Sequence, residues 1–478
     1  MELPWIPPEL LSCILQMMDT PDDLISIIIV FRLFREAFYS APAFYLGVVL
    51  RRAIEPAATQ HALACLHITT KAMDREARLA VLDRYFTRSN DFQFPADMES
   101  LTALSRLYNR VEYFIDDYAS RAMRTAAGKQ WTLNDWDRTL APAERARFQR
   151  AFFQHEMYCC VFPAQREVAR RDRELVTPSS YVYYLPFEGL DPVATVVDYL
   201  YEVPPDQRPD GGLSFRTGIE SQYIHFLSKL HAWELEEMSC VHHYLGTLAK
   251  ESFTRLESQF VKAATSASAV ASTSARDEDL VGFDNLSTTD LRNFARNNTK
   301  WILIASPTAL VYKGLSFIHQ LAVSDDDQRR DMLTRFDWAS WVFPSSCLPP
   351  GPLVRIGGSQ IFSFGSTLFG QSRDQAAASP EAGQNDPSCA SAGFRRFVCA
   401  GERDRDFQLL QERAFVFWMD RKVLELELSL RRPAERLSHL SYLIANHVYA
   451  EERLAGVRVT REQMKRLQED FGCALSSE

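Results

Sequence analysis

The residues of this chain that are best suited to bind a metal ion lie between positions 225 and 243. Zinc prefers imidazole and thiolate ligands, and its structural sites favour ligand pairs spaced two to four residues apart. The stretch has the periodicity of one continuous helix, on which His225 and His231 point to different faces. Only Cys240 with His242 or His243 has a ligand spacing. We therefore predict no metal site here and no bound cofactor.

A second candidate is the acidic run of residues 324–331, SDDDQRRD. In an all-α protein such a run is similar to the magnesium-binding motif of terpene synthases, and Asp327 and Asp331 share a helical face. The spacing of that motif is not met, and no partner motif of Asn, Ser and Glu follows. Three carboxylates ahead of Arg329 and Arg330 predict instead the solvated first turn of a helix with local charge pairing.

Motifs for covalent or phosphate chemistry are missing from the sequence. It has no Gly-x-Ser-x-Gly elbow, no His-Glu-x-x-His pair, no phosphate-binding loop and no dinucleotide-binding glycine pattern. Cys159 and Cys160 stand within a helical pattern, where buried and inert thiols are expected. The sequence therefore offers no candidate catalytic residues of these classes.

The composition of the chain limits the kind of protein that it can be. The chain has 478 residues, a formal charge of −9 and 46% hydrophobic residues, which is enough for two or three domains with a large core. No segment is dominated by Lys and Arg, so we expect no nucleic-acid partner. Nine scattered Cys without a Cys-x-x-Cys pair indicate free thiols in a reducing compartment.

No membrane partner is expected either. The longest apolar run, Ile27 to Phe31, is far shorter than the ~20 residues of a membrane span. The N-terminus has no basic region ahead of an apolar run, so no signal peptide is predicted. These features place the protein in the cytoplasm or the nucleus, and the sequence does not choose between the two.

Helical periodicity dominates the chain. It predicts helices over residues 43–54, within 60–87, along the apolar stripe from Leu101 to Ile115, and over 142–162. Residues 353–370 have the pattern of a short hairpin. Two stretches rich in Ser, Ala and other small or polar residues, 264–279 and 371–393, predict a flexible linker and a disordered insertion.

The opening residues 6–35 hold more apolar side chains than about thirty residues can enclose. Three short amphipathic helices are predicted there. Pro7 and Pro8 suit a first helical turn, and Thr20 with Pro21 and Asp23 has the pattern of a second helix start. Such a unit either docks on the rest of the chain or keeps an apolar face for a partner.

This opening unit resembles an F-box, whose usual form is Leu-Pro-x-Glu-Leu-Leu, Ile-Leu, Asp-Leu and Val-Cys-Arg-x-Phe-Arg. Ile6 and Phe31 replace the opening Leu and the Cys of that pattern. The remaining matches are Pro7, Glu9, Leu10, Leu11, Ile14, Leu15, Asp23, Leu24, Val30, Arg32, Phe34 and Arg35. The resemblance implies contacts with a Skp-type adaptor through Pro7, Leu10, Leu11, Ile14, Leu15, Leu24 and Val30.

Two segments of the body extend the resemblance. RFQRAFFQHEMYCCVF, residues 147–162, resembles a segment in F-box proteins of filamentous fungi, and AFVFWMDRKVL, residues 414–424, is similar to a late Gly-Tyr-Val-Phe-Trp-Asp segment of the same proteins. The expected fold is mainly α: an F-box-like three-helix head (1–50) on an all-helical body with disordered insertions. The body is divided into 51–263, a linker at 264–279, and 280–478.

The resemblance implies a non-catalytic substrate receptor of a cullin–RING ubiquitin ligase of the SCF type. Its partners would be the adaptor, the cullin scaffold and a protein substrate that the sequence does not name. Two other hypotheses stay open. One is an F-box-like interaction scaffold that works outside a ligase, and the other is an all-α enzyme that uses the aspartates of residues 324–331.

Overall fold

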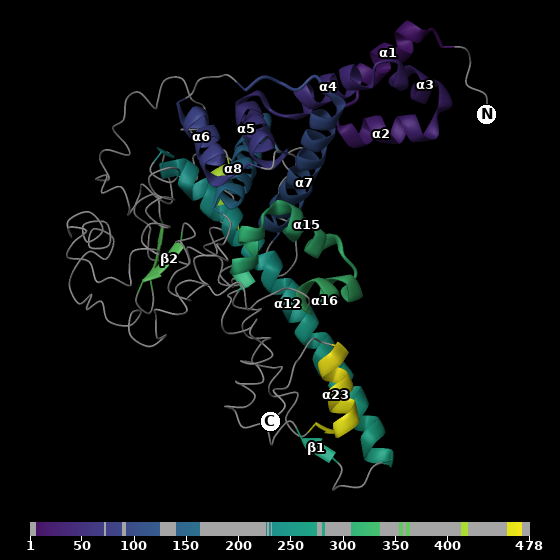
Figure 1. Ribbon diagram of the computed structural model, residues 1–478, viewed down its shortest axis with the longest axis vertical. Helices are drawn as coiled ribbons and strands as arrows, with labels where there is room; N and C mark the ends of the chain where they lie inside the picture. The colour runs from purple at the N-terminus through teal and green to yellow at the C-terminus, as the bar shows by residue number, and fades with distance from the viewer. Residues whose placement is uncertain are drawn as a thin grey trace, which may run out of the picture.

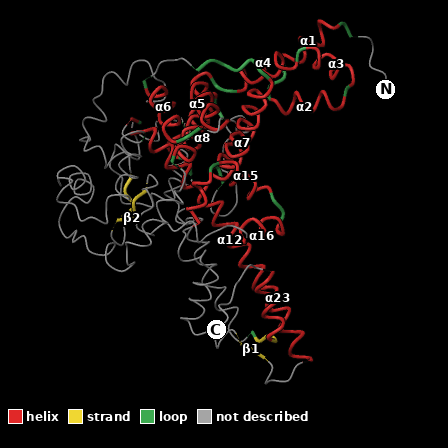
Figure 2. Tube along the Cα trace, viewed as in Figure 1, coloured by secondary structure: helices red, strands yellow, loops and turns green. Residues whose placement is uncertain are grey.

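The computed structural model is mainly α-helical, with twelve α-helices and four short strands in the part of the chain that it describes (Figures 1 and 2). This confirms the expected fold class. The described residues are 6–70, 73–87, 92–124, 140–162, 226, 229–230, 232–274, 280–282, 307–334, 353–356, 360–363, 413–418 and 457–470.

Four helices form a unit that projects from one end of the molecule (Figure 1). They are α1 (Pro8–Gln16), α2 (Pro21–Val30), α3 (Arg32–Ser40) and α4 (Pro42–Ala53). We call residues 6–53 the head and the remaining described residues the body. The predicted domain boundary at residue 50 falls inside α4, which ends at Ala53. Buried side chains of the head and of the body belong to one hydrophobic core.

The body is built around α8 (Pro142–Val161), which is buried along nearly its whole length. It is surrounded by the short 3-10 helix η1 (Pro56–Ala58), α5 (Thr59–Thr70), α6 (Arg75–Phe86) and α7 (Met98–Ala122). The predicted helices at 43–54, 60–87 and 142–162 are therefore confirmed. The stripe from Leu101 to Ile115 also lies in a helix, where it packs into the core.

The longest helix, α12 (Ala232–Ser274), packs against α8 and continues away from the body as an arm (Figure 1). It also contacts η7 (Pro307–Lys313), α15 (Leu315–Val323), α16 (Asp326–Thr334) and α23 (Arg461–Asp470). Strand β1 (Leu280–Gly282) pairs antiparallel with β4 (Arg458–Thr460) near the end of the arm, with Val281 opposite Val459.

The prediction of a flexible linker over 264–279 is wrong for residues 264–274, because α12 runs to Ser274. Alanine has the highest helix propensity of all residues, and its small side chain allows close packing. Ala264 and Ala271 are fully buried in the structure, and the carbonyl of Ala267 accepts a hydrogen bond from Gln463 (3.2 Å). Small residues here form a packing face that apolar periodicity does not reveal.

Two further predictions, a hairpin and a disordered insertion, concern the C-terminal half of the chain. The hairpin is confirmed for residues 353–356 and 360–363, where β2 (Leu353–Ile356) pairs antiparallel with β3 (Gln360–Ser363). The predicted insertion at 371–393 lies outside the described residues. The short 3-10 helix η12 (Phe415–Phe417) inserts into the body, where the ring of Phe417 stacks on Phe148 with centroids 3.9 Å apart.

Candidate protein-interaction surface

Local chemistry explains where the helices of the head begin. Pro8 is the first residue of α1, where its missing N–H costs no hydrogen bond. At α2, the Thr20 hydroxyl accepts a hydrogen bond from the Asp23 amide, and the Asp23 carboxylate accepts one from the Thr20 amide, both at 3.1 Å. This reciprocal capping box satisfies two amides that a helix start leaves without partners.

Arg35 explains how α2 ends and α3 can follow without a loop. Its Nε donates to the carbonyl of Ile28 (2.9 Å) and its Nη2 donates to the carbonyl of Ile29 (2.6 Å). Both carbonyls belong to the last turn of α2, where no amide of the helix reaches them. The arginine that ends the F-box-like pattern therefore has a structural task in this fold.

The inward face of the head forms a small core of its own that merges with the core of the body. Leu15 and Leu24 are almost completely buried, and Phe34 and Phe38 of α3 pack in the same core cluster. The rings of Phe31 and Phe34 meet edge to face, with centroids 6.0 Å apart. The three helices are thus held together by apolar contacts from all of them.

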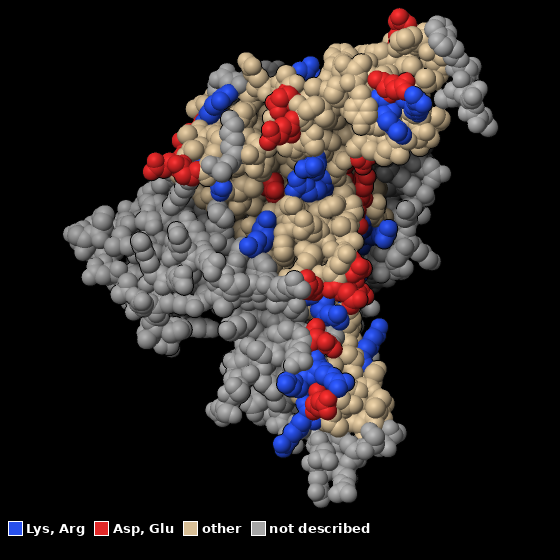
Figure 3. Space-filling model, turned by 45° about the vertical axis from the view of Figure 1, so that its right-hand side comes forward, with Lys and Arg blue, Asp and Glu red and all other residues tan. Residues whose placement is uncertain are grey.

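The outward face of the head is also apolar. Of the thirteen exposed large hydrophobic residues in the described chain, nine lie in the head: Leu10, Met17, Ile25, Ile29, Val30, Phe31, Leu33, Tyr39 and Phe44. We call these nine residues the apolar surface. Met17, Val30 and Tyr39 each expose more than two thirds of their area. Figure 3 shows that uncharged residues cover most of the visible face of the head. Contiguous exposed apolar side chains are a common property of surfaces that bind another protein, so we treat the apolar surface as the candidate site.

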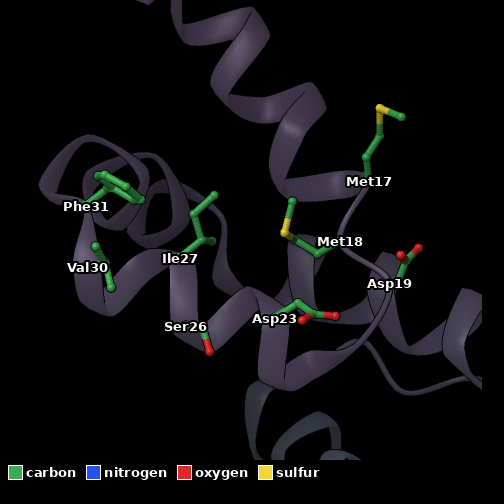
Figure 4. A pocket seen from close by; sticks show the side chains of 8 residues that line it. All are labelled: Met17, Met18, Asp19, Asp23, Ser26, Ile27, Val30 and Phe31. Carbon is green, nitrogen blue, oxygen red and sulfur yellow. The ribbon is translucent and has the colours of Figure 1, made fainter. Parts of the chain in front are cut away.

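A shallow pocket of about 460 Å³ lies between the end of α1 and α2 (Figure 4). Its apolar lining comes from both helices, and two carboxylates and a hydroxyl lie beside it. The lining residues are Met17, Met18, Asp19, Asp23, Ser26, Ile27, Val30 and Phe31. Three of them, Met17, Val30 and Phe31, belong to the apolar surface, so the pocket adjoins part of that surface.

Polar contacts order the head and join it to the body. Within the head, Arg52 of α4 donates to the carbonyl of Met17 (2.8 Å) and to the carboxylate of Asp19 (2.5 Å). Asn109 of α7 donates to Asp22 at the start of α2 (2.6 Å). The side-chain amide of Gln149 of α8 donates to the carbonyl of Ala53 (3.3 Å), the last residue of α4. These contacts hold the apolar surface in one position relative to the body.

The seven predicted adaptor contacts divide into two groups. Leu10 and Val30 are exposed, by 54% and 68%, and Pro7 and Ile14 are half-buried. Leu11, Leu15 and Leu24, in contrast, are at most 6% exposed in this arrangement. They face the inner side of the helices, where they build the core of the head.

Most of the apolar surface was not singled out in the sequence. Met17, Ile25, Ile29, Leu33, Tyr39 and Phe44 lie outside the F-box-like pattern. One feature of the sequence does indicate exposed apolar side chains in the head. Residues 27–31 are five apolar residues in a row on a short helix, and a helix docked through one stripe cannot bury a run that goes around its circumference.

The candidate metal ligands do not converge. α12 begins at Ala232, so the prediction of a continuous helix from residue 225 is wrong for its first turns, and His225 and His231 lie outside the described residues. His242 instead meets His155 of α8, with Nδ1 and Nε2 3.4 Å apart. In the described part of the chain, no group of three or more His, Cys, Asp or Glu side chains is arranged to hold a metal ion.

Burial keeps these groups uncharged. It lowers the pKa of His242 to about 4 and places the pKa of His155 well below its usual value, with a further lowering by the neighbouring imidazole. Burial also raises the pKa of the Cys159 and Cys160 thiols, which are therefore protonated. As predicted for this pair of cysteines, the environment favours inert thiols over nucleophilic thiolates.

Charged residues are also buried between α8 and α12. Arg150 binds Glu237 through two nitrogens, with contacts of 2.7 to 3.1 Å, and its guanidinium lies 4.2 Å from the ring centroid of Trp233. Gln154 donates to Glu234 (3.2 Å). We call these residues, with His155 and His242, the polar seam. Burial raises the pKa of Glu237 to about 7, although the charge of Arg150 acts in the opposite direction.

The acidic run behaves as the helix start that was predicted. Asp325 accepts a hydrogen bond from the Gln328 amide (2.8 Å) ahead of α16. Asp326 pairs with Arg329 (2.7 Å) and Asp327 pairs with Arg330 (3.0 Å). The three aspartates are exposed and each is engaged in a local contact, so their arrangement fits helix capping and charge pairing.

A search of the described helices found none with the length and hydropathy of a membrane span. Comparisons of the chain with family models, with curated proteins and with solved structures found no match.

Proposed function

We propose that this chain is the substrate receptor of a cullin–RING ubiquitin ligase of the SCF type, and that its head binds a Skp-type adaptor. The observation that carries the proposal is the apolar surface, which places nine of thirteen exposed large hydrophobic residues on four consecutive short helices. Leaving such side chains in water is unfavourable by about 25 cal/mol for each Å² of apolar area. A protein partner removes that cost.

The F-box-like pattern supports the choice of partner. Its residues take two roles in the head: Leu11, Leu15 and Leu24 build the core, while Leu10 and Val30 stay exposed. A pattern that supplies both a small core and an outer apolar face is what an adaptor-binding head requires. The revised adaptor contacts are therefore Leu10, Val30 and the half-buried Pro7 and Ile14, with neighbouring members of the apolar surface.

Two segments of the body also support the F-box proposal. The two segments that resemble fungal F-box proteins lie far apart in the sequence, yet their described parts pack on each other in the core. Phe148 stacks on Phe417 and meets Trp418 edge to face, and Arg147 donates to the carbonyl of Phe417 (3.1 Å). Such a scaffold holds a substrate near the ubiquitin-charged enzyme and raises its local concentration, so it needs no acid, base or nucleophile. Such a ligase subunit works in the cytoplasm or the nucleus.

Binding to a purified Skp-type adaptor tests the proposal. We expect Leu10→Asp with Val30→Asp to weaken adaptor binding at least tenfold, by about 1.4 kcal/mol or more, because a charge would be buried in an apolar interface. Both side chains are exposed, so the helical content and melting temperature should stay as in the wild type. Val270→Asp with Val323→Asp, two exposed valines outside the head, is the matched control.

Unchanged binding by the head variant, or no binding by the wild type, contradicts the proposed contacts. Co-elution with the cullin scaffold then separates a ligase subunit from the alternative function. Adaptor binding without cullin would indicate an interaction scaffold that works outside a ligase. The enzyme hypothesis for residues 324–331 predicts a rise in melting temperature with magnesium, whereas the proposed receptor predicts none.

A further inference from the structure

Arginine is far more frequent than lysine in this chain. Of the 53 Lys and Arg residues, 44 are Arg and 9 are Lys. Residues 1–228 contain only Lys71 and Lys129 next to twenty-two Arg, and the first seventy residues contain no Lys. In the described residues between Ile6 and Phe162, every cationic side chain coloured blue in Figure 3 is therefore an arginine.

Some of these positions require a guanidinium. Arg35 donates to two carbonyls at once, and Arg150 binds both oxygens of Glu237 in the polar seam. A planar group with several donors in a fixed arrangement makes such contacts, and an ammonium does not reproduce them. The fold explains arginine at these two positions.

At exposed positions the fold does not require arginine. Arg32 pairs with Glu36 through a single Nε contact of 2.7 Å, and its side chain is 87% exposed. Arg466 pairs with Glu462 in the same i to i+4 arrangement, also through one nitrogen. Lysine makes pairs of this kind on helices equally well. The absence of lysine from the described residues between Ile6 and Phe162 therefore needs an explanation other than packing or charge pairing.

Ubiquitin transfer distinguishes the two residues. The ε-amine of Lys attacks the thioester that links ubiquitin to the conjugating enzyme. The carbon–nitrogen bond of an isopeptide forms, the carbon–sulfur bond breaks, and the amine loses its proton as the enzyme thiol is released. The guanidinium of Arg stays protonated in proteins, and its charge is delocalised, so it is no acceptor.

We propose that arginine in place of lysine protects residues 1–228 of this chain from ubiquitination by the ligase to which it belongs. The inference rests on the proposed function. A receptor that holds a substrate next to charged ubiquitin exposes its own amines to the same high local concentration. A chain with few amines near the head stays intact while its substrate is modified.

The test uses the full chain assembled with adaptor, cullin, RING protein and charged conjugating enzyme. Arg51→Lys, Arg106→Lys and Arg124→Lys are combined, since all three side chains are exposed and keep their charge. The change raises the number of lysines in residues 1–228 from two to five. We expect ubiquitin on this half of the chain, measured by mass spectrometry, to rise about twofold or more in proportion to the acceptors.

The matched control replaces the same three arginines with Gln, which removes charge without adding an amine, and it should match the wild type. The formation of free ubiquitin chains reports that the assembled ligase is active. An active ligase that modifies the lysine variant no more than the wild type overturns the inference and leaves the proposed function standing. Failure of the complex to assemble removes both proposals.

Discussion

The head and the polar seam both depart from the usual rule that apolar side chains are buried and charged side chains are exposed. The head leaves nine large apolar residues in water, whereas α8 and α12 bury an ion pair and two histidines in the centre of the body. Each arrangement costs free energy when it stands alone. The seam meets that cost inside the chain, because Arg150 and Glu237 are each other's partner, whereas the apolar surface of the head is left uncovered in this structure.

The difference between the two regions separates side chains that hold the fold together from side chains that are available for binding. Buried charged groups with matched partners fix how α8 and α12 pack, and they offer no access to a substrate. Exposed apolar groups contribute little to the stability of the chain and are free to contribute to binding. The interaction surface that we propose is therefore the part of this protein whose surface is least suited to water.

The largest expected effect comes from breaking the ion pair of the seam. Arg150→Ala leaves the carboxylate of Glu237 buried without its partner, which is expected to lower the free energy of unfolding by about 3–5 kcal/mol. Chemical denaturation followed by circular dichroism measures the change. Arg32→Ala removes the exposed pair with Glu36 on the head and should leave the stability almost unchanged. Equal losses in the two variants would contradict the contrast between seam and head.

An intermediate effect is expected from acid. The pKa of His242 is lowered to about 4 in the folded chain, so the unfolded state binds more protons between pH 6.5 and 4. The stability contributed by the neutral imidazole is present above pH 6.5 and is lost as the pH falls towards 4, by about 3 kcal/mol at 1.36 kcal/mol for each pKa unit.

Urea denaturation across this pH range measures the loss. His242→Gln cannot take up the proton, so its stability should depend less on pH over the same interval. The head contains no histidine, and its helices should not contribute to the acid dependence of this range. A variant that keeps the full pH slope of the wild type would show that another group causes it.

The smallest effect is expected in the head itself. Thr20→Ala removes the hydroxyl of the capping box and should destabilise α2 by about 1 kcal/mol. Hydrogen exchange at the amides of α2 measures this local loss, while amides of α8 serve as the unaffected reference. Thr20→Ser keeps the hydroxyl and should exchange as the wild type does. If the amides of α2 exchange as slowly in the alanine variant as in the wild type, packing and not the capping box holds α2 in place.

Local signals in the sequence determined most of the helices. The helix predicted over 43–54 runs from Pro42 to Ala53, and the acidic run begins a helix as expected. Prolines at the first helical position, Thr20 as a cap and repeating apolar residues act within a few positions along the chain. Their effect on the backbone therefore does not depend on what packs nearby.

Burial could be decided only by the tertiary structure. Leu10 and Leu11 are adjacent and chemically identical, yet one is exposed and the other buried, because α3 and α4 cover only one side of α1. His242 was weighed with its neighbours in sequence, but its partner His155 lies 87 residues away. Contacts of this kind depend on which helix faces meet, and that is settled by packing between distant segments.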